Sequence, residues 1–208
     1  MKNRQEGFVR VCVFGASSNG IPQACIDFAY MLGKSLAQDG IGLVFGAGTT
    51  GLMGAAARGA DSADGEIIGV IPERLNISGI YYENCTERIV TATMHERKAK
   101  MENLADAFVA LPGGFGTLEE LMEVITLKQL GYHEKPIVIA NINGFYDNLL
   151  KQFNDCVCKG FTHPLFLELY SVADTVAEVM RKIKQKLDKK MPSKMEEALL
   201  SARFAKKK

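Results

Sequence analysis

The sequence predicts an α/β protein with one domain, residues 1–190, built on a doubly wound, Rossmann-like parallel sheet with helices on both faces. Short β-branched apolar runs alternate with longer segments whose apolar residues recur at helical spacing. Several of these runs end in glycine-rich turns, as strands do at the ligand-binding edge of such a sheet. The 208 residues suffice for one full core. Residues 191–208 are predicted to form a basic C-terminal tail.

Composition and charge narrow the function classes. A net charge of +1 gives no electrostatic basis for binding nucleic acid or a membrane surface. The sequence has no apolar run near the roughly 20 residues that a membrane helix needs, and Met1–Gly7 is too polar for a signal peptide. The five cysteines are odd in number, and Cys156-x-Cys158 lacks metal-ligand spacing. We therefore expect a cytoplasmic protein with free thiols and no metal site.

The first predicted unit is a strand, a loop and a helix. Phe8–Phe14 is rich in β-branched and aromatic residues, which favour a strand. The strand ends in Gly15–Gly20, a loop of small hydrogen-bond donors. Pro22 suits the first position of a helix, and apolar residues at helical spacing continue to Gln38. This unit predicts the ligand-binding edge of an open sheet.

The second unit contains a glycine pattern with two interpretations. After a strand at Ile41–Phe45, Gly46–Gly51 fits G-x-G-x-x-G, the fingerprint of dinucleotide binding. The pattern follows the second strand rather than the first, and Glu66 would begin the next strand where the ribose-binding acid should end one. Glu73 ends that strand but comes late. A second glycine turn in the same crevice is favoured, and an NAD-dependent enzyme stays an alternative.

The third strand, Glu66–Ile71, is expected to stop at Pro72. The next segment, Arg74–Thr93, has mixed polarity and is interpreted as an irregular excursion with a short strand at Arg88–Val90. A connection of this length in a compact domain is usually functional. The same signals predict strands over Asp106–Leu111, Pro136–Ala140 and Tyr170–Val172, and helices over Met94–Leu104, Thr117–Leu130, Phe145–Cys158 and Thr175–Leu187.

The helix at Met94–Leu104 carries cations beside its apolar stripe. Helical spacing puts Met94, Met101 and Leu104 on one face with either Arg97 or Lys98. In one interpretation the methionines are core residues and the cations keep their charged ends in water. In the other, the start of this helix faces the same pocket as the glycine turn that follows the next strand.

That glycine turn is the centre of the sequence. The apolar run to Leu111 ends in Pro112-Gly113-Gly114-Phe115-Gly116-Thr117, and a helical pattern follows. A strand, glycine turn and helix N-terminus direct backbone N–H groups and the positive end of a helix dipole at one point, which suits a phosphate or a carboxylate. An alternative interpretation is structural, because Thr117 and Glu120 have the spacing of a capping box.

These motifs together resemble a known family. Pro112–Glu120 matches P-G-G-x-G-T-x-x-E, and Met94–Lys98 matches M-x-x-R-K, the two signatures of the LOG ("lonely guy") family. Gly51–Gly54 and Phe14–Ser18 also fit. The resemblance covers residues 8–185, and its combined signature is specific, whereas the separate glycine turns are not.

The resemblance implies a cytokinin riboside 5′-monophosphate phosphoribohydrolase without a cofactor. Such an enzyme cleaves the N-glycosidic bond of AMP or N6-prenylated AMP and releases the base and ribose 5-phosphate. It also implies a homodimer or higher homo-oligomer, for which Tyr81-Tyr82 and the methionine helix offer apolar surface. Its catalytic pair would be Arg97 and Glu120, and its substrate contacts Gly15, Ser17, Met94, Lys98, Gly113, Gly114, Phe115, Gly116, Thr117 and Thr126.

The chemistry of these residues agrees with that reaction. An oxocarbenium-like transition state places positive charge on the ribose, and the Glu120 carboxylate can stabilise it and orient the attacking water. Arg97 would serve the leaving base, hold the phosphate or orient Glu120. Members that carry the label lysine decarboxylase suggest another chemistry, but the sequence has no identifiable Schiff-base lysine context.

One departure from the family concerns the base. Many members carry an acid in the loop before the M-x-x-R-K signature, whereas Leu75–Gly79 has none and Glu83 is the nearest candidate. The runner-up function is a non-catalytic carrier of a nucleotide or cofactor on the same fold. In that case the chain would resemble the molybdenum cofactor carrier proteins, which share the glycine-rich phosphate turn. A carrier would not need Arg97 and Glu120 together, so the pair favours the enzyme.

Overall fold

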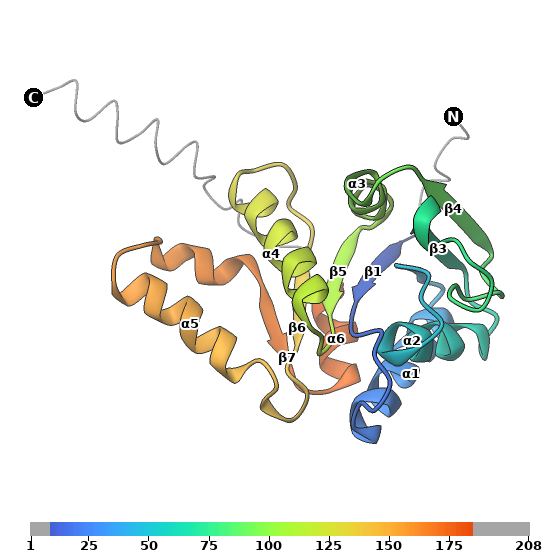
Figure 1. Ribbon diagram of the computed structural model, residues 1–208. Helices are drawn as coiled ribbons and strands as arrows, with labels where there is room; N and C mark the ends of the chain where they lie inside the picture. The colour runs from blue at the N-terminus through green and yellow to red at the C-terminus, as the bar shows by residue number, and fades with distance from the viewer. Residues whose placement is uncertain (1–8, 185–208) are drawn as a thin grey trace, which may run out of the picture.

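The computed structural model describes residues 9–184. Within that range, seven strands form one sheet in the order β4-β3-β2-β1-β5-β6-β7, and all neighbouring strands are parallel (Figure 1). The predicted doubly wound α/β fold is therefore confirmed. The strands are β1 (Arg10–Phe14), β2 (Gly42–Phe45), β3 (Ile67–Pro72), β4 (Glu87–Thr91), β5 (Ala107–Ala110), β6 (Ile137–Ala140) and β7 (Ser171–Ala173).

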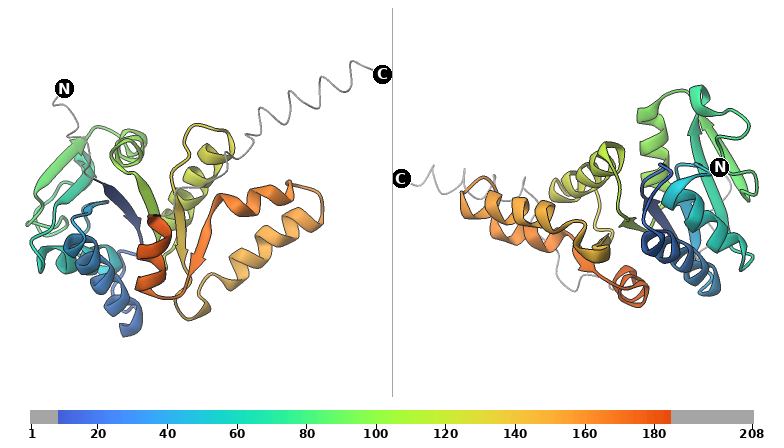
Figure 2. Two further views of the ribbon diagram at one scale, coloured as in Figure 1. Left: turned by 180° about the vertical axis from the view of Figure 1, so that it is seen from behind. Right: turned by 60° about the horizontal axis from the view of Figure 1, so that its bottom comes forward.

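Helices cover both faces of the sheet (Figures 1 and 2). One hydrophobic cluster joins the sheet to α1, α2 and α6, and a second joins its other face to α3, α4 and α5. The helices are α1 (Gln23–Gln38), α2 (Gly51–Asp61), α3 (Met94–Leu104), α4 (Phe115–Gln129), α5 (Asp147–Cys158) and α6 (Val176–Ile183), with short 3₁₀ turns η1 (Glu73–Leu75), η2 (Ile142–Gly144) and η3 (Pro164–Leu169).

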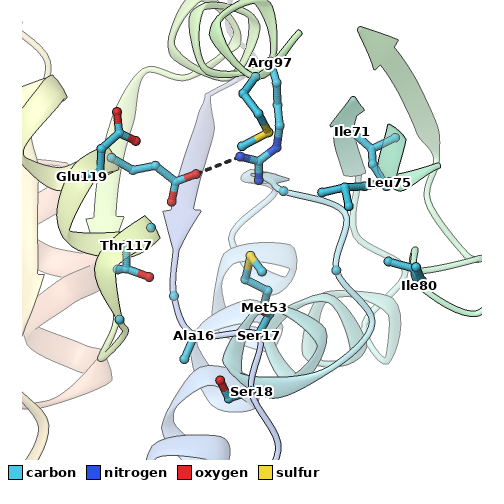
Figure 3. A pocket seen from close by; sticks show the side chains of 17 residues that line it. Ala16, Ser17, Ser18, Met53, Ile71, Leu75, Ile80, Arg97, Thr117 and Glu119 are labelled. Atoms are coloured by element: carbon cyan, nitrogen blue, oxygen red, sulfur yellow. Dashed lines mark hydrogen bonds and ion pairs between the residues drawn. The ribbon is translucent and has the colours of Figure 1, made fainter. Parts of the chain in front are cut away.

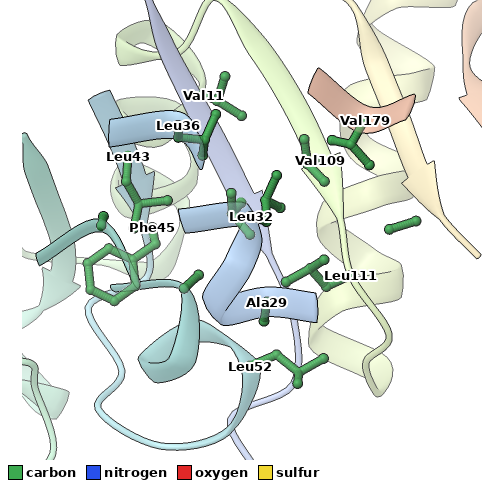
Figure 4. Packing of buried hydrophobic residues seen from close by; sticks show 14 of the residues in the cluster. Val11, Ala29, Leu32, Leu36, Leu43, Phe45, Leu52, Val109, Leu111 and Val179 are labelled. Atoms are coloured by element: carbon green, nitrogen blue, oxygen red, sulfur yellow. The ribbon is translucent and has the colours of Figure 1, made fainter. Parts of the chain in front are cut away.

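The inner strands are apolar on both faces. Every residue of β2, β3, β5 and β6 is buried, as expected for parallel strands between two helical layers. The edge strand β4 is instead largely exposed. Figure 4 shows the cluster on the α1 face, where strand side chains meet the apolar stripe of α1: Val11, Leu43, Phe45 and Val109 from strands and Ala29, Leu32 and Leu36 from α1.

Two glycines let α1 and α2 pack in close contact. A Cβ at Gly33 of α1 would lie 1.9 Å from the carbonyl oxygen of Ala56, and a Cβ at Gly59 of α2 would lie 1.9 Å from that of Tyr30. Larger residues would force the helices apart. The contact holds α2 beside the loop after β1, where the amide of Leu52 donates a hydrogen bond to Ala16 O at 2.8 Å.

The chain order reverses between β1 and β5. Strands β1 to β4 progress outward in one direction, and the chain then returns through α3 to place β5 against the other side of β1. Phe14 and Ala110 pair in register near the ends of these two strands. A crevice forms beyond the carboxyl ends of strands at such a switch point, and the glycine-rich turns after both strands border it.

The structure corrects several predicted details. Pro72 is the last residue of β3 and does not interrupt it, and Pro22 lies just before α1 rather than at its first position. Tyr82 offers no apolar surface, because it is only 8% exposed and its hydroxyl donates a hydrogen bond to Asp61. The proposed tail, residues 191–208, lies outside the described residues.

Candidate active site

A pocket of about 350 Å³ lies beyond the carboxyl ends of β1, β2 and β5 (Figure 3). The turns after these strands and the first residues of α3 and α4 enclose it. Its volume falls in the usual range of small-molecule sites, roughly 300–1,000 Å³. It is lined by Gly15, Ala16, Ser17, Ser18, Gly46, Gly48, Met53, Ile71, Leu75, Ile80, Met94, Arg97, Gly114, Gly116, Thr117, Glu119 and Glu120.

An ion pair crosses the pocket from α3 to α4. Arg97 Nη1 donates a hydrogen bond to Glu120 Oε1 at 3.0 Å, and the two side chains are only 8% and 11% exposed. Arg97 Nε also donates to the carbonyl oxygen of Val70 in β3, at 3.1 Å. The Arg97 charge is therefore inside the pocket, and the interpretation that left it in water is wrong.

Burial and the ion pair act on Glu120 in opposite directions. Removal from water raises the pKa of the Glu120 carboxyl, and the neighbouring Arg97 guanidinium lowers it; the pKa stays above its usual value. Burial together with a specific charge partner is the combination that shifts the pKa of carboxylates at functional sites. Arg97, with a smaller contribution from Lys98, thus favours the charged form of this largely buried carboxylate.

The N-terminus of α4 borders the pocket and contains backbone amides that the helix itself does not pair. The helix begins at Phe115 with Gly114 as its cap, and no side chain caps it. Its first helical hydrogen bond runs from Leu118 N to Gly114 O at 3.0 Å, so the three preceding amides have no acceptor within the helix. The capping-box interpretation is wrong, because Thr117 lies inside the helix and Glu120 contacts Arg97 instead.

The glycine turn after β2 lines the same pocket, as predicted. Gly46 and Gly48 both border it. An isolated antiparallel bridge joins Gly48 to Tyr81, and Thr49 N donates to Ile80 O at 3.1 Å. The irregular excursion after β3 is therefore attached to this turn and contributes to the pocket wall.

An apolar wall faces the polar side of the pocket, and the sequence interpretation missed it. Ile71 is the next-to-last residue of β3, while Leu75 and Ile80 come from the excursion and are each 44% exposed. Met53 of α2 also lines the pocket (Figure 3). The only sequence signal was the length of the excursion. Glu83 is exposed, does not line the pocket and accepts a hydrogen bond from Ser78 at 3.4 Å.

Eight of the twelve predicted site residues line the pocket, and these are Gly15, Ser17, Met94, Arg97, Gly114, Gly116, Thr117 and Glu120. The other four do not. Lys98 instead forms ion pairs with Glu119 and Glu123. Gly113 packs against the Thr117 side chain. Phe115 is 93% exposed, and Thr126 is exposed further along α4.

The fold is shared with solved structures. A molybdenum cofactor binding protein from Rippkaea orientalis aligns with a TM-score of 0.67 at 23% identity, over 85% of this chain and 96% of the other. The molybdenum cofactor carrier protein of Chlamydomonas reinhardtii aligns with a TM-score of 0.66 at 25% identity, over 88% and 99% of the two chains. The first likeness shows the fold alone.

Curated proteins found by sequence are more similar to this chain in sequence than the solved structures are. A cytokinin riboside 5′-monophosphate phosphoribohydrolase of Arabidopsis thaliana is 44% identical over 77% of this chain and 76% of its own length. Another, of Oryza sativa subsp. japonica, is 46% identical over 76% of this chain and 65% of its own length.

No helix among residues 9–184 is long and apolar enough to cross a membrane.

The sequence model of the family described as "possible lysine decarboxylase" matches residues 53–183, which include α3, the glycine turn before α4 and the Arg97–Glu120 pair. The match spans more than half of the chain. With these matches, the chain belongs to the possible lysine decarboxylase family, together with the cytokinin riboside 5′-monophosphate phosphoribohydrolases of the LOG type.

Proposed function

We propose that this protein hydrolyses the N-glycosidic bond of adenosine-type 5′-monophosphates, giving free base and ribose 5-phosphate. The observation that carries the proposal is the Arg97–Glu120 ion pair, which is largely buried in a pocket beside the N-terminus of α4. The names of relatives at 44% and 46% identity support the same reaction. No lysine lines this pocket, so nothing in it supports a Schiff base and decarboxylation.

The substrate phosphate would bind at the start of α4. The amides there precede the first helical hydrogen bond, and the helix dipole adds positive charge. Gly114 and Gly116 have open space where a Cβ would stand, so a phosphate can approach the backbone. Ser17 and Ser18, across the pocket, supply hydroxyl groups. The phosphate would then anchor the sugar beside Glu120.

Glu120 would act on the ribose. Its carboxylate offsets the positive charge that develops at the sugar when the bond to the base breaks, and it can accept a proton from the attacking water. Arg97 keeps Glu120 charged and lies close enough to interact with the departing base. Because an arginine stays protonated near neutral pH, it would act here as a fixed positive charge.

The apolar wall suggests where the base would lie. With the phosphate at α4, the base would extend toward Ile71, Leu75 and Ile80. A hydrocarbon substituent on the base would gain binding energy by covering these side chains. We therefore propose that N6-prenylated AMP is preferred over AMP.

The carrier function makes different predictions, and one experiment separates the two. Purified protein is incubated with AMP and, separately, with isopentenyladenosine 5′-monophosphate, and the products are separated by chromatography. Free base with ribose 5-phosphate supports the hydrolase. Tight binding of either nucleotide without base release would support the carrier and contradict the proposal.

We also propose that the protein forms a homodimer through the outer face of α4 and the adjoining α5. Phe115, Met122 and Thr126 share this face of α4 by helical spacing and are exposed. No residue of α5 is buried, and Phe161 after it is 81% exposed. Light scattering at micromolar concentration should give the mass of two chains, and Phe161→Asp should reduce it to one. A wild-type monomer would contradict the dimer.

A further inference from the structure

Gly46 lies in contact with the guanidinium of Arg97. A Cβ placed at Gly46 would lie 1.9 Å from Arg97 Nη2 and 3.1 Å from Arg97 Cζ. The first distance is far inside van der Waals contact. Gly46 is not among the glycines with positive φ, so its backbone conformation does not itself require glycine. The space taken by Arg97 is what excludes a side chain.

Three separate segments fix this guanidinium. Nε donates to Val70 O in β3, Nη1 donates to Glu120 in α4, and Nη2 lies over Gly46 in the turn after β2. Figure 3 shows Arg97 extending from α3 into the pocket between α4 and the strand ends. The contact at Gly46 adds a third segment to the two that hold the guanidinium by hydrogen bonds.

We propose that Gly46 is a positioning residue whose missing side chain forms the socket that holds Arg97 against Glu120. This assigns a role to the G-x-G-x-x-G pattern at Gly46–Gly51 that needs no dinucleotide. The structural part stands on geometry alone, and its effect on turnover rests on the proposed hydrolase function.

Gly48 provides a matched comparison in the same turn. A Cβ at Gly48 would meet only the terminal carbon of Met53, at 3.1 Å, and that flexible side chain can move aside. Gly48 also borders the pocket and lacks a positive φ. Gly46→Ala and Gly48→Ala therefore add the same methyl group to the same turn, but only the first displaces Arg97.

Thermal unfolding tests the socket without any assumption about the reaction. Gly46→Ala should lower the Tm in the wild-type background and should leave it unchanged or raised in the Arg97→Ala background, where the obstruction is gone and alanine restricts the unfolded chain. Gly48→Ala should shift the Tm equally in both backgrounds. An equal loss from Gly46→Ala in both backgrounds would overturn the proposal.

The pH profile of turnover tests the effect on Glu120. The charged groups that act on Glu120 are Arg97 and Lys98 from α3 and Glu119 beside it on α4. Without Arg97 in place, the pKa of Glu120 should rise, so the acid limb of kcat should move to higher pH in Gly46→Ala. We expect kcat to fall on the order of 100-fold, as for other small misplacements of catalytic groups. Gly48→Ala should leave the limb in place.

The outcomes separate the two proposals. An unchanged limb and kcat in Gly46→Ala, with wild-type protein active, would overturn the positioning role. If Gly46→Ala changed the Tm by the same amount with and without Arg97, the socket itself would be overturned. If the wild-type protein released no base, the hydrolase function would fail, while the Tm comparison would still decide whether Gly46 holds Arg97.

Discussion

Arg97 and Glu120 form a 3.0 Å ion pair between two helices that start on opposite sides of the pocket. In the sequence, β5 and a glycine turn separate the two residues. Helix α3 leads from the edge strand β4 back to β5 at the centre of the sheet, and α4 follows β5, so the two helices lie on either side of β5 in the chain. The pair joins a fixed positive charge to a carboxylate, and burial raises the pKa of that carboxylate.

Glu120→Gln should abolish most of the turnover while the protein stays folded. The amide keeps the size and can still accept a hydrogen bond from Arg97, but it cannot offset charge on the sugar or accept a proton from water. We expect kcat to fall by about 10²–10⁴-fold, the usual contribution of such a group. Initial rates of base release measure it, with circular dichroism as the folding control. Wild-type turnover would remove Glu120 from the mechanism.

Arg97→Lys should lower kcat although the charge is kept. A lysine has a single ammonium group and cannot donate from one rigid fork to both Val70 O and Glu120. We expect a loss on the order of tenfold or more. Lys100→Arg on the same helix is the control, because Lys100 is exposed and outside the pocket. Equal rates for wild type and Arg97→Lys would show that the fork geometry does not matter.

The rate of hydrolysis should fall on acidification earlier than an ordinary glutamate would cause. Burial raises the pKa of Glu120, and the carboxylate is the active form, so activity is complete above that raised pKa and is lost as the pH falls through it. A profile of kcat/KM from pH 4 to pH 8 measures the limb. A limb at the position of an unperturbed glutamate, about pH 4.3, would contradict this role.

Leu75→Ser should weaken the preference for a prenylated base. Leu75 belongs to the apolar wall and is 44% exposed, so a hydrocarbon group on the base can cover it. We expect kcat/KM for isopentenyladenosine 5′-monophosphate to fall roughly tenfold, as when an apolar pocket contact is lost, with little change for AMP. Leu165→Ser, exposed but outside this pocket, is the control. An equal fall for both nucleotides would place the base elsewhere.

His133 should make the fold less stable in mild acid. Burial lowers the pKa of His133 to about 4, and its ring bonds to Val124 O at 3.0 Å. Above about pH 6.5 neither state is protonated. As the pH falls toward 4, only the unfolded chain binds the proton, so stability is lost in that window. Because the ring is partly exposed, we expect about 1–2 kcal/mol.

Urea unfolding at pH 7 and pH 4.5 measures this loss against His133→Gln. Glutamine cannot titrate, so the variant should lose less stability than the wild type between the two pH values. An identical loss in both proteins would contradict a linked proton at His133.

The fold was predictable from sequence because its inner strands are apolar on both faces and the turns after them contain glycine. Each predicted strand corresponds to an observed one, and the largest differences are at element ends. The helix α4 illustrates the limit. The Thr117 and Glu120 spacing resembled a capping box, but the helix begins at Phe115 because Gly114 can serve as the cap.

The candidate site was predictable only where motifs mark it. The position of Arg97 depends on Val70 O and on the space above Gly46, and helical periodicity contains neither contact. Residues of the irregular excursion, such as Leu75 and Ile80, have no period that would indicate which side faces the pocket. Lys98 follows the family signature, yet it forms ion pairs with Glu119 and Glu123 of α4 and does not itself line the pocket.

Hydrolysis in H₂¹⁸O tests the central claim most directly. Wild-type protein and Glu120→Gln are each incubated with isopentenyladenosine 5′-monophosphate, and the masses of the products are measured by mass spectrometry. We expect the wild type to form free base and ribose 5-phosphate that carries one ¹⁸O on the sugar, and the variant to form far less of both. Label in inorganic phosphate, or bound nucleotide that stays intact, would contradict it.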